Sequence, residues 1–227
     1  KSYYHKSLLP IIAHIKTIVI PNGVVGVEYF YDKDGKRDLN KLIYASDYFR
    51  GLNLMLQHGW GIIKKQVPCA TLDIFYGWDF FDAVWEKDRD KQKWKQKMVD
   101  LMNQPGIREL GRVGQDVLAK KFKKANILYY GSTFKEIDCI TVRQAAVAGC
   151  IPCTTDYGVL AQKPYSIKVK GNPFSKETHI SLAYTVTELL LKSNAADSNV
   201  EQKRREFMNQ AQKESWSYVA KKWSQFF

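Results

Sequence analysis

The chain has 227 residues, of which 45% are hydrophobic and 13% aromatic, and its formal net charge is +12. This length and composition predict one large or two small globular domains and exclude a disordered protein. The longest run without a charged residue, Gly51 to Ile63, has 13 residues, fewer than the roughly 20 that a membrane-spanning helix needs.

The first part of the chain predicts two strands and one helix. Ile18–Ile20 is a short β-branched run that we expect to be a strand ending at the turn formed by residues 21–23, Pro-Asn-Gly. A second strand is predicted over Leu42–Ala45. After a loop that contains Arg50 and Gly51, a helix is predicted by apolar residues at helical spacing, namely Leu52, Met55, Leu56 and Ile63.

The middle of the chain repeats this alternation. The predicted strands are Thr71–Tyr76, Ile107–Leu110, Asn126–Tyr130, Ile151–Thr154 and Ser166–Val169. The helices between them are one long Lys- and Trp-rich stretch to about Asn103, one from about Gln115 to Lys123 and one from about Asp138 to Ala148. Strands that alternate with helices predict an α/β fold with a doubly wound, Rossmann-like parallel sheet covered on both faces.

The C-terminal tail is predicted to be helical from Lys176 onward. Its last helix carries a continuous apolar stripe that must pack against another surface, made of Trp216, Val219, Ala220, Trp223 and Phe227.

Cysteine and histidine chemistry has little support. Cys150 and Cys153 have the spacing of a redox pair, but the β-like run around them favours two buried strand cysteines. With Cys69 and Cys139 they make too few cysteines for a disulfide framework in a chain of this length, which favours a cytoplasmic protein. The four histidines show no close-spaced ligand or nucleophile-base pattern, so no metal site is predicted.

Two strand ends are suited to bind phosphate. Ligands of open parallel sheets bind beyond the carboxyl ends of the strands, where helix N-termini present unpaired N–H groups. In the first loop Gly51 permits a close backbone approach and Arg50 can bind phosphate oxygens. In the second, residues 134–141, the helix amides would point outward, and the carboxylate of Glu136 can accept hydrogen bonds from sugar hydroxyls.

Residues 136–149, Glu-Ile-Asp-Cys-Ile-Thr-Val-Arg-Gln-Ala-Ala-Val-Ala-Gly, resemble the signature of group 1, retaining glycosyltransferases of the GT-B fold. The resemblance continues in order along the chain at residues 20–23, 50–51, 72–77, 111–113 and 155–158. It departs from the family at Gln144, which replaces a second Glu, and at Tyr44, where a basic residue is frequent.

The resemblance implies a role for each matching residue. Arg50 and Glu136 would be catalytic: Arg50 would neutralise the diphosphate and stabilise the leaving group, and Glu136 would orient the donor sugar. Gly51 belongs to the same phosphate loop. The remaining implied contacts are backbone N–H groups that hold the diphosphate without a metal, at Asp138, Cys139, Ile140 and Thr141; a nucleobase shelf at Arg112 and Val113; and a ribose contact at Gln144.

The resemblance also implies the organisation of the enzyme. Residues 1–23 would be the remnant of a preceding domain and its linker, and residues 24–227 a C-terminal donor-binding domain. The donor would be a nucleotide-diphosphate sugar, UDP or GDP above all, with no other cofactor, and the acceptor a glycan or a lipid-linked molecule. Because the acceptor would be bound by a missing N-terminal domain, this chain alone is expected to be catalytically incomplete. An anionic membrane surface is a further expected partner, which would place a cytoplasmic protein at the membrane periphery.

Two other functions remain open from the residues alone. The basic residues of 120–124 and 87–97 could form a nucleic-acid-binding surface, although no recognition helix or stacking sheet is evident. A sugar-phosphate isomerase of related two-lobed fold is the other alternative.

Overall fold

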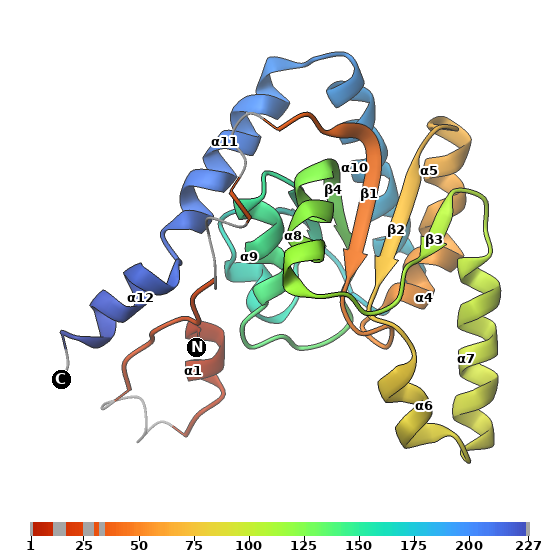
Figure 1. The fold of residues 1–227 in the computed structure, drawn as a ribbon, viewed down its shortest axis with the longest axis horizontal. Coiled ribbons are helices and arrows are strands. Elements are labelled where there is room, and N and C mark those ends of the chain that lie inside the picture. The colour runs from red at the N-terminus through yellow and green to blue at the C-terminus, as the bar shows by residue number, and fades with distance from the viewer. Residues whose placement is uncertain (1, 11–16, 25–29, 32–34, 226–227) are drawn as a thin grey trace.

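A computed structural model describes residues 2–10, 17–24, 30–31 and 35–225. Six strands form one parallel sheet in the order β3-β2-β1-β4-β5-β6, and all of them point toward the same edge (Figure 1). The strands are β1 (Asp38–Ala45), β2 (Thr71–Phe75), β3 (Ile107–Glu109), β4 (Ala125–Tyr130), β5 (Ile151–Thr155) and β6 (Ile167–Val169). This order and direction confirm the doubly wound, Rossmann-like sheet.

The centre of the sheet is apolar because its strands are covered on both faces. All six residues of β4 are buried. Leu42 of β1 lies opposite Leu72 of β2 and Ile127 of β4, and all three side chains are fully buried. The strand order reverses between β1 and β4, so the sheet has its topological switch point there.

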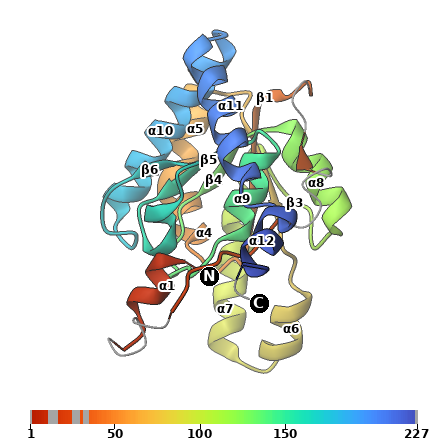
Figure 2. The same cartoon turned by 90° about the vertical axis from the view of Figure 1, so that its left-hand side faces the viewer.

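Helices cover the two faces. α8 (Gln115–Lys124) and α9 (Ile140–Val147) lie in front of the sheet in Figure 1, and α11 (Ser198–Gln212) packs on α9. The other face is covered by α10 (Lys176–Asn194) and by a helical segment made of α4 (Leu52–Met55), the π-helix η1 (Leu56–Trp60) and α5 (Gly61–Gln66). The 90° view in Figure 2 shows the same two layers edge-on.

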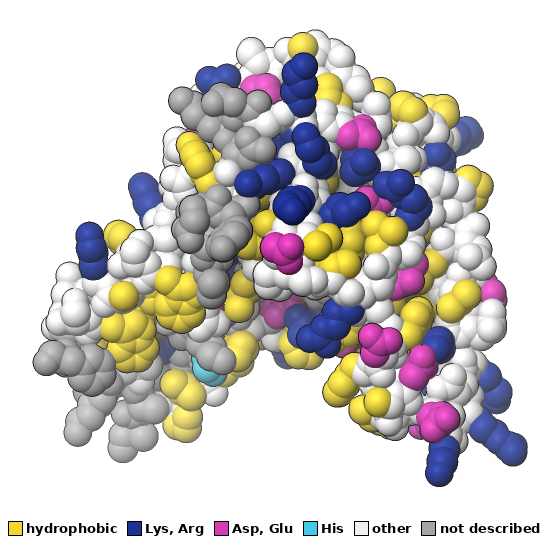
Figure 3. Space-filling view, viewed as in Figure 1, with side chains coloured by type: hydrophobic (Ala, Val, Ile, Leu, Met, Phe, Trp, Pro, Cys, Tyr) yellow, Lys and Arg dark blue, Asp and Glu magenta, His cyan; other side chains and the backbone are white. Residues whose placement is uncertain are grey.

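Two limbs extend beyond the carboxyl ends of the strands. One consists of α6 (Asp79–Trp85) and α7 (Arg89–Met102), and the other of α1 (Tyr3–Ser7) and α12 (Trp216–Trp223). The molecular surface is hollowed between them (Figure 3). A ligand at the carboxyl ends of the central strands would therefore lie at the bottom of this hollow.

Two secondary-structure predictions were wrong. Residues 17–20, which include the predicted strand Ile18–Ile20, have no regular secondary structure. The segment after them instead forms a parallel bridge between Val24 and Ser215. The predicted long helix to Asn103 is two helices, because the Asp88 side chain accepts hydrogen bonds from the first backbone N–H groups of α7 and starts a new helix there.

Most other boundaries move by one or two residues, but β1 begins four residues before the predicted Leu42 and α5 ends three residues after Ile63. Two short elements were not predicted. α9 begins at Ile140 instead of Asp138. The helix α1 and the 3-10 helix η2 (Gly158–Gln162) had no counterpart in the sequence prediction. The predicted helical tail is confirmed as α10, α11 and α12, joined by short turns.

The apolar stripe of the last helix is largely uncovered. Val219 is fully buried, whereas Trp216 and Trp223 are 44% and 47% exposed, and Ala220 is exposed as well. Phe227 lies outside the described residues. Among the described helices, none combines the length and the apolar character that crossing a bilayer requires.

The cysteines near β5 are buried and free, as expected. Cys153 lies within β5 and Cys150 directly before it. Burial raises the pKa of each thiol to about 12, so both remain protonated and unreactive at neutral pH.

Candidate functional site

A cavity of about 770 Å³ opens at the carboxyl ends of β1 and β2. Its walls come from the loops after β1, β2 and β3, from the first turns of α8 and α9, and from two segments that are distant in sequence, residues 22–23 and Trp216. Because the wall joins the end of β1 to the start of α9, the helix that follows β4, the cavity lies at the topological switch point between β1 and β4, where ligands of doubly wound folds bind. Its volume is within the range that holds a small organic ligand.

Six of the ten predicted site residues line this cavity. They are Arg50, Arg112, Val113, Ile140, Thr141 and Gln144. Gly51, Glu136, Asp138 and Cys139 are not on its wall. The cavity thus combines two arginines with the start of α9, which are the groups an anionic ligand needs.

Arg50 and Glu136, the two predicted catalytic residues, contact each other. Arg50 Nη1 forms an ion pair with Glu136 Oε1, and the Tyr130 hydroxyl donates to the same oxygen at 2.8 Å. Glu136 is only 5% exposed, so its carboxylate lies behind Arg50. The guanidinium also lies over the ring of Phe134, with 4.5 Å between its carbon and the ring centroid.

The neighbouring Tyr130 and Glu136 keep Arg50 in its charged form. Burial alone would lower the pKa of Arg50, but Tyr130 and Glu136 oppose it and raise that pKa above its ordinary value. A guanidinium carries five N–H donors in a planar fork. Arg50 can therefore hold Glu136 with one edge and direct donors into the cavity with another.

Position 51 requires glycine because of its backbone conformation and its close contact with the backbone of Gly131. Its φ is +93°, and an added Cβ would lie 2.3 Å from the Gly131 carbonyl oxygen. The same contact brings Thr133 N within 3.3 Å of the Arg50 carbonyl oxygen. The close approach is therefore to the end of β4, and it holds the Arg50 loop in place; contact between Gly51 and a ligand remains a prediction.

The start of α9 lies on the wall of the cavity. Cys139 is the N-cap residue and its side chain makes no capping hydrogen bond, while Ile140 and Thr141 lie on the wall. The Thr141 hydroxyl donates to the Ala45 carbonyl oxygen at 3.1 Å, which fixes the helix start to the end of β1. This end of an eight-residue helix has the partial positive charge that favours an anion.

The far side of the cavity is lined by Gln144, Arg112 and Val113. Gln144 Nε2 donates to Gln115 Oε1 at 2.8 Å, so the side-chain amide oxygen of Gln144 can still accept a hydrogen bond. Gly77 allows the Arg112 loop to approach, because its φ is +82° and an added Cβ would lie 2.9 Å from Arg112 N. Arg112 is exposed and Val113 half-buried at this end.

Sequence reasoning missed several wall residues. Asn22, Gly23 and Trp216 line the cavity because residues 22–24 and 214–216, here called the paired segments, run side by side. Val24 N donates to the Glu214 carbonyl oxygen at 3.0 Å, and an added Cβ on Gly23 would meet the Trp216 ring at 2.6 Å. The sequence signalled these residues only through the Pro-Asn-Gly turn and the apolar stripe that contains Trp216, and neither pattern showed that the two segments pair.

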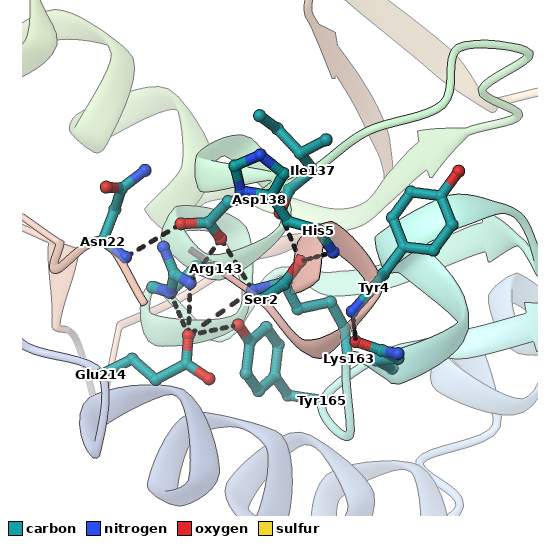
Figure 4. A network of polar contacts seen from close by, with 11 residues as sticks. Ser2, Tyr4, His5, Asn22, Ile137, Asp138, Arg143, Lys163, Tyr165 and Glu214 are labelled. Carbon is teal, nitrogen blue, oxygen red and sulfur yellow. Dashed lines mark hydrogen bonds and ion pairs between the residues drawn. The ribbon is translucent and has the colours of Figure 1, made fainter. Parts of the chain in front are cut away.

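A buried ionic network joins the paired segments to the start of α9 (Figure 4). The carboxylate of Asp138 accepts from Asn22 N at 2.9 Å, from Arg143 Nη2 at 2.8 Å and from Lys163 Nζ at 3.0 Å. Glu214 forms ion pairs with Arg143 and, at 3.6 Å, with Lys163. Arg143 is fully buried. The Asp138 side chain therefore has a structural role, whereas its predicted ligand contact concerned backbone N–H groups.

The network sets the charge of Asp138. Burial alone would raise the pKa of this carboxyl, but Lys163 and Arg143 outweigh burial and hold the pKa below its usual value. In the described part of the chain, no group of three or more His, Cys, Asp or Glu side chains is arranged to hold a metal ion.

Comparisons with known proteins identify the fold. No family model and no curated protein matches the sequence, but solved structures match the fold over nearly the whole chain. Sucrose-phosphate synthase from Thermosynechococcus elongatus superposes with a TM-score of 0.70 at 15% identity, over 100% of this chain and 56% of that one. A glycosyltransferase from Rickettsia africae gives 0.71 at 14% identity, over 99% and 61%.

A third solved structure contains ligands. Anabaena HepE, solved with UDP and glucose, matches with a TM-score of 0.65 at 12% identity, over 94% of this chain and 57% of that one. This chain therefore spans little more than half the length of these three structures. The fold is the Rossmann-like α/β architecture of one lobe of a GT-B glycosyltransferase.

Proposed function

We propose that this chain is the donor-binding lobe of a retaining, group 1 glycosyltransferase and that it binds a nucleotide-diphosphate sugar in the 770 Å³ cavity. The observation that carries the proposal is the position of Arg50 and the start of α9 on one wall of that cavity, at the topological switch point of a GT-B lobe. A nucleoside diphosphate has the charge that these groups compensate.

The cavity suggests how the donor would lie. The diphosphate would sit between Arg50 and the backbone N–H groups at the start of α9. The ribose would contact the side-chain amide oxygen Oε1 of Gln144, and the base would lie against Arg112 and Val113. The sugar would extend toward Glu136, whose carboxylate also positions Arg50 through their ion pair.

Arg50 would act in the chemical step as well as in binding. When the glycosidic bond breaks, negative charge develops on the leaving diphosphate, and a fixed guanidinium and helix N-terminus stabilise that charge. These groups would do so without a divalent metal. The transfer itself, to a glycan or lipid-linked acceptor, is part of the proposal, as is the expectation that a second domain is needed.

Binding of UDP, GDP, ADP and CDP, measured by calorimetry with and without magnesium, tests the proposal. We expect one diphosphate to bind without the metal, and UDP is the first candidate because HepE was solved with it. Arg50→Ala should weaken that binding by about 1.5 to 3 kcal/mol, the range for a charged hydrogen bond.

Arg205→Ala, which removes an exposed arginine on α11, is the matched control and should bind like the wild type. Absence of binding by all four diphosphates, strict dependence on magnesium, or equal effects of the two substitutions would contradict the proposal.

A further inference from the structure

The buried ionic network in Figure 4 joins two parts of the donor-cavity wall that are distant in sequence. One part is the start of α9, and the other is formed by the paired segments, which contribute Asn22 and Trp216 to the wall. Each part carries one carboxylate of the network. Asp138 lies just before α9, and Glu214 lies two residues before Trp216.

Arg143 of α9 connects these two carboxylates. Its Nη2 donates to Asp138 Oδ1 at 2.8 Å, and its Nε donates to Glu214 Oε2. Lys163 Nζ lies 3.0 Å from Asp138 and 3.6 Å from Glu214, so it supports the same connection. The Arg143 side chain is fully buried and does not line the cavity. It can therefore affect a ligand there only through the residues that it holds.

The hydrogen bonds of the network fix directions as well as distances. The two oxygens of Asp138 are held separately, Oδ2 by Asn22 N at 2.9 Å and Oδ1 by the two cations. A guanidinium donates in a rigid planar fork. The segments that carry Asp138 and Glu214 therefore cannot slide past each other in the way that two apolar surfaces can.

Stability alone does not account for a buried arginine at position 143. A buried ion pair loses the hydration of both charges, and well-packed apolar side chains of similar volume are often at least as stabilising. Arg143 Nη1 also has no hydrogen-bond partner in the described part of the chain, and an unpaired buried donor costs free energy. What a directional network adds to apolar packing is a defined relative position of the segments that it joins.

We infer that Arg143 is a positioning residue of the donor site. Through Asp138 and Glu214 it holds the start of α9 and the paired segments in one fixed arrangement, in which the N–H groups of α9 meet the diphosphate of the donor. The inference rests on the proposed function, because it takes the diphosphate to lie at the start of α9.

Two variants separate this positioning role from an effect of charge. The two cations and two carboxylates of the network balance each other. Glu214→Gln leaves a surplus positive charge, which by itself would tighten the binding of an anion, whereas a lost position weakens it. Arg143→Lys keeps the charge and removes the fork, so it changes the position alone.

Calorimetric titration with UDP, or with whichever of GDP, ADP and CDP the wild type binds best, tests the inference. Arg143→Lys and Glu214→Gln should each weaken binding about fivefold, the cost of misaligning one hydrogen bond. Arg204→Lys is the matched control. Arg204 is a buried arginine of α11 that donates to Asn126 Oδ1 and to the Gly149 carbonyl oxygen, and it does not line the cavity. This variant should lose stability and bind like the wild type.

The indole N–H signal of Trp216 gives a second readout, by NMR without any nucleotide. Trp216 lines the cavity, so its signal should move in Arg143→Lys and stay in place in Arg204→Lys. The signal of Trp60, which is buried, should stay in place in both variants.

Unchanged affinity in Arg143→Lys and Glu214→Gln would overturn the inference, as would tighter binding by Glu214→Gln or an equal loss in Arg204→Lys. If Arg143→Lys does not fold, Glu214→Gln still decides the question. Wild-type binding with unaffected variants would overturn this inference alone, whereas a wild type that binds none of the four diphosphates would overturn the proposed function.

Discussion

Removing the Arg143 guanidinium by Arg143→Met should destabilise the protein strongly. Arg143 is fully buried and pairs with both Asp138 and Glu214, and Lys163 is the second cation of the same cluster. The four charges sum to zero. Methionine fills a similar volume without charge, so the variant leaves two carboxylates with one ammonium group.

The expected loss is about 3 kcal/mol of unfolding free energy. Removing one partner of a buried ion pair costs about 3 to 5 kcal/mol. Two features place this case at the lower end: Lys163 remains 3.0 Å from Asp138, and Glu214 is 23% exposed at its side chain and keeps some hydration. For a chain of this size, the loss corresponds to roughly 6 to 12 °C in melting temperature.

Urea unfolding followed by circular dichroism measures the change. Arg143→Lys keeps the charge but not the fork, so it should lose less than Arg143→Met. Lys192→Met removes an exposed pair with Glu188 and should leave the unfolding midpoint unchanged. A variant Arg143→Met that is as stable as the wild type would show that the network contributes nothing to stability, and that the paired segments are held by other contacts.

Three further outcomes are expected. Glu136→Ala should weaken calorimetric binding of UDP through the lost ion pair with Arg50 and should weaken that of UDP-glucose further, since only UDP-glucose carries the sugar. Equal losses for the two ligands would mean that Glu136 acts only through Arg50. Gly51→Ala should destabilise the fold by about 1 to 3 kcal/mol, because φ is +93° and the added Cβ would meet Gly131. Gly61→Ala is the control, because nothing lies within 4 Å of an added Cβ there, and this variant should keep its stability. Similar melting curves for the two variants would refute the predicted difference in stability. Burial lowers the pKa of His179, whose Nε2 bonds to the Pro173 carbonyl oxygen. The unfolded chain therefore binds a proton at this histidine more readily than the folded chain does. The free energy of unfolding should fall as the pH decreases below about 6.5. A flat profile from pH 7.5 to about 5.5 would contradict this, and His5→Gln should keep the slope.

The sheet could be predicted from the sequence because each central strand is a short apolar run between helices. The run Ile18–Ile20 has the same composition but forms no strand. Strand formation needs a neighbour with free backbone groups, and whether one is available depends on tertiary structure. Val24, a few residues further on, instead pairs with Ser215, and no local sequence pattern predicts this partner.

The donor cavity was predictable where it depends on strand ends. Arg50, Arg112 and the start of α9 follow three strands, and parallel strands bring such loops to one edge. The burial of Glu136 behind Arg50 was not predictable, because it depends on side-chain packing. For the same reason the sequence did not predict that Phe49, in the loop after β1, stacks on Trp94, in a stretch that indicated only a helix.

Hydrogen exchange with and without UDP, read by mass spectrometry, tests the central claim most directly. If the nucleotide diphosphate binds in the cavity, UDP should slow exchange in the loops after β1 and β3 and in the first turn of α9, at residues 46–51, 111–115 and 138–144. Peptides of α10 and β6, which do not line the cavity, should exchange at unchanged rates. Protection confined to another part of the chain, or no protection at a UDP concentration that saturates binding, would contradict the account.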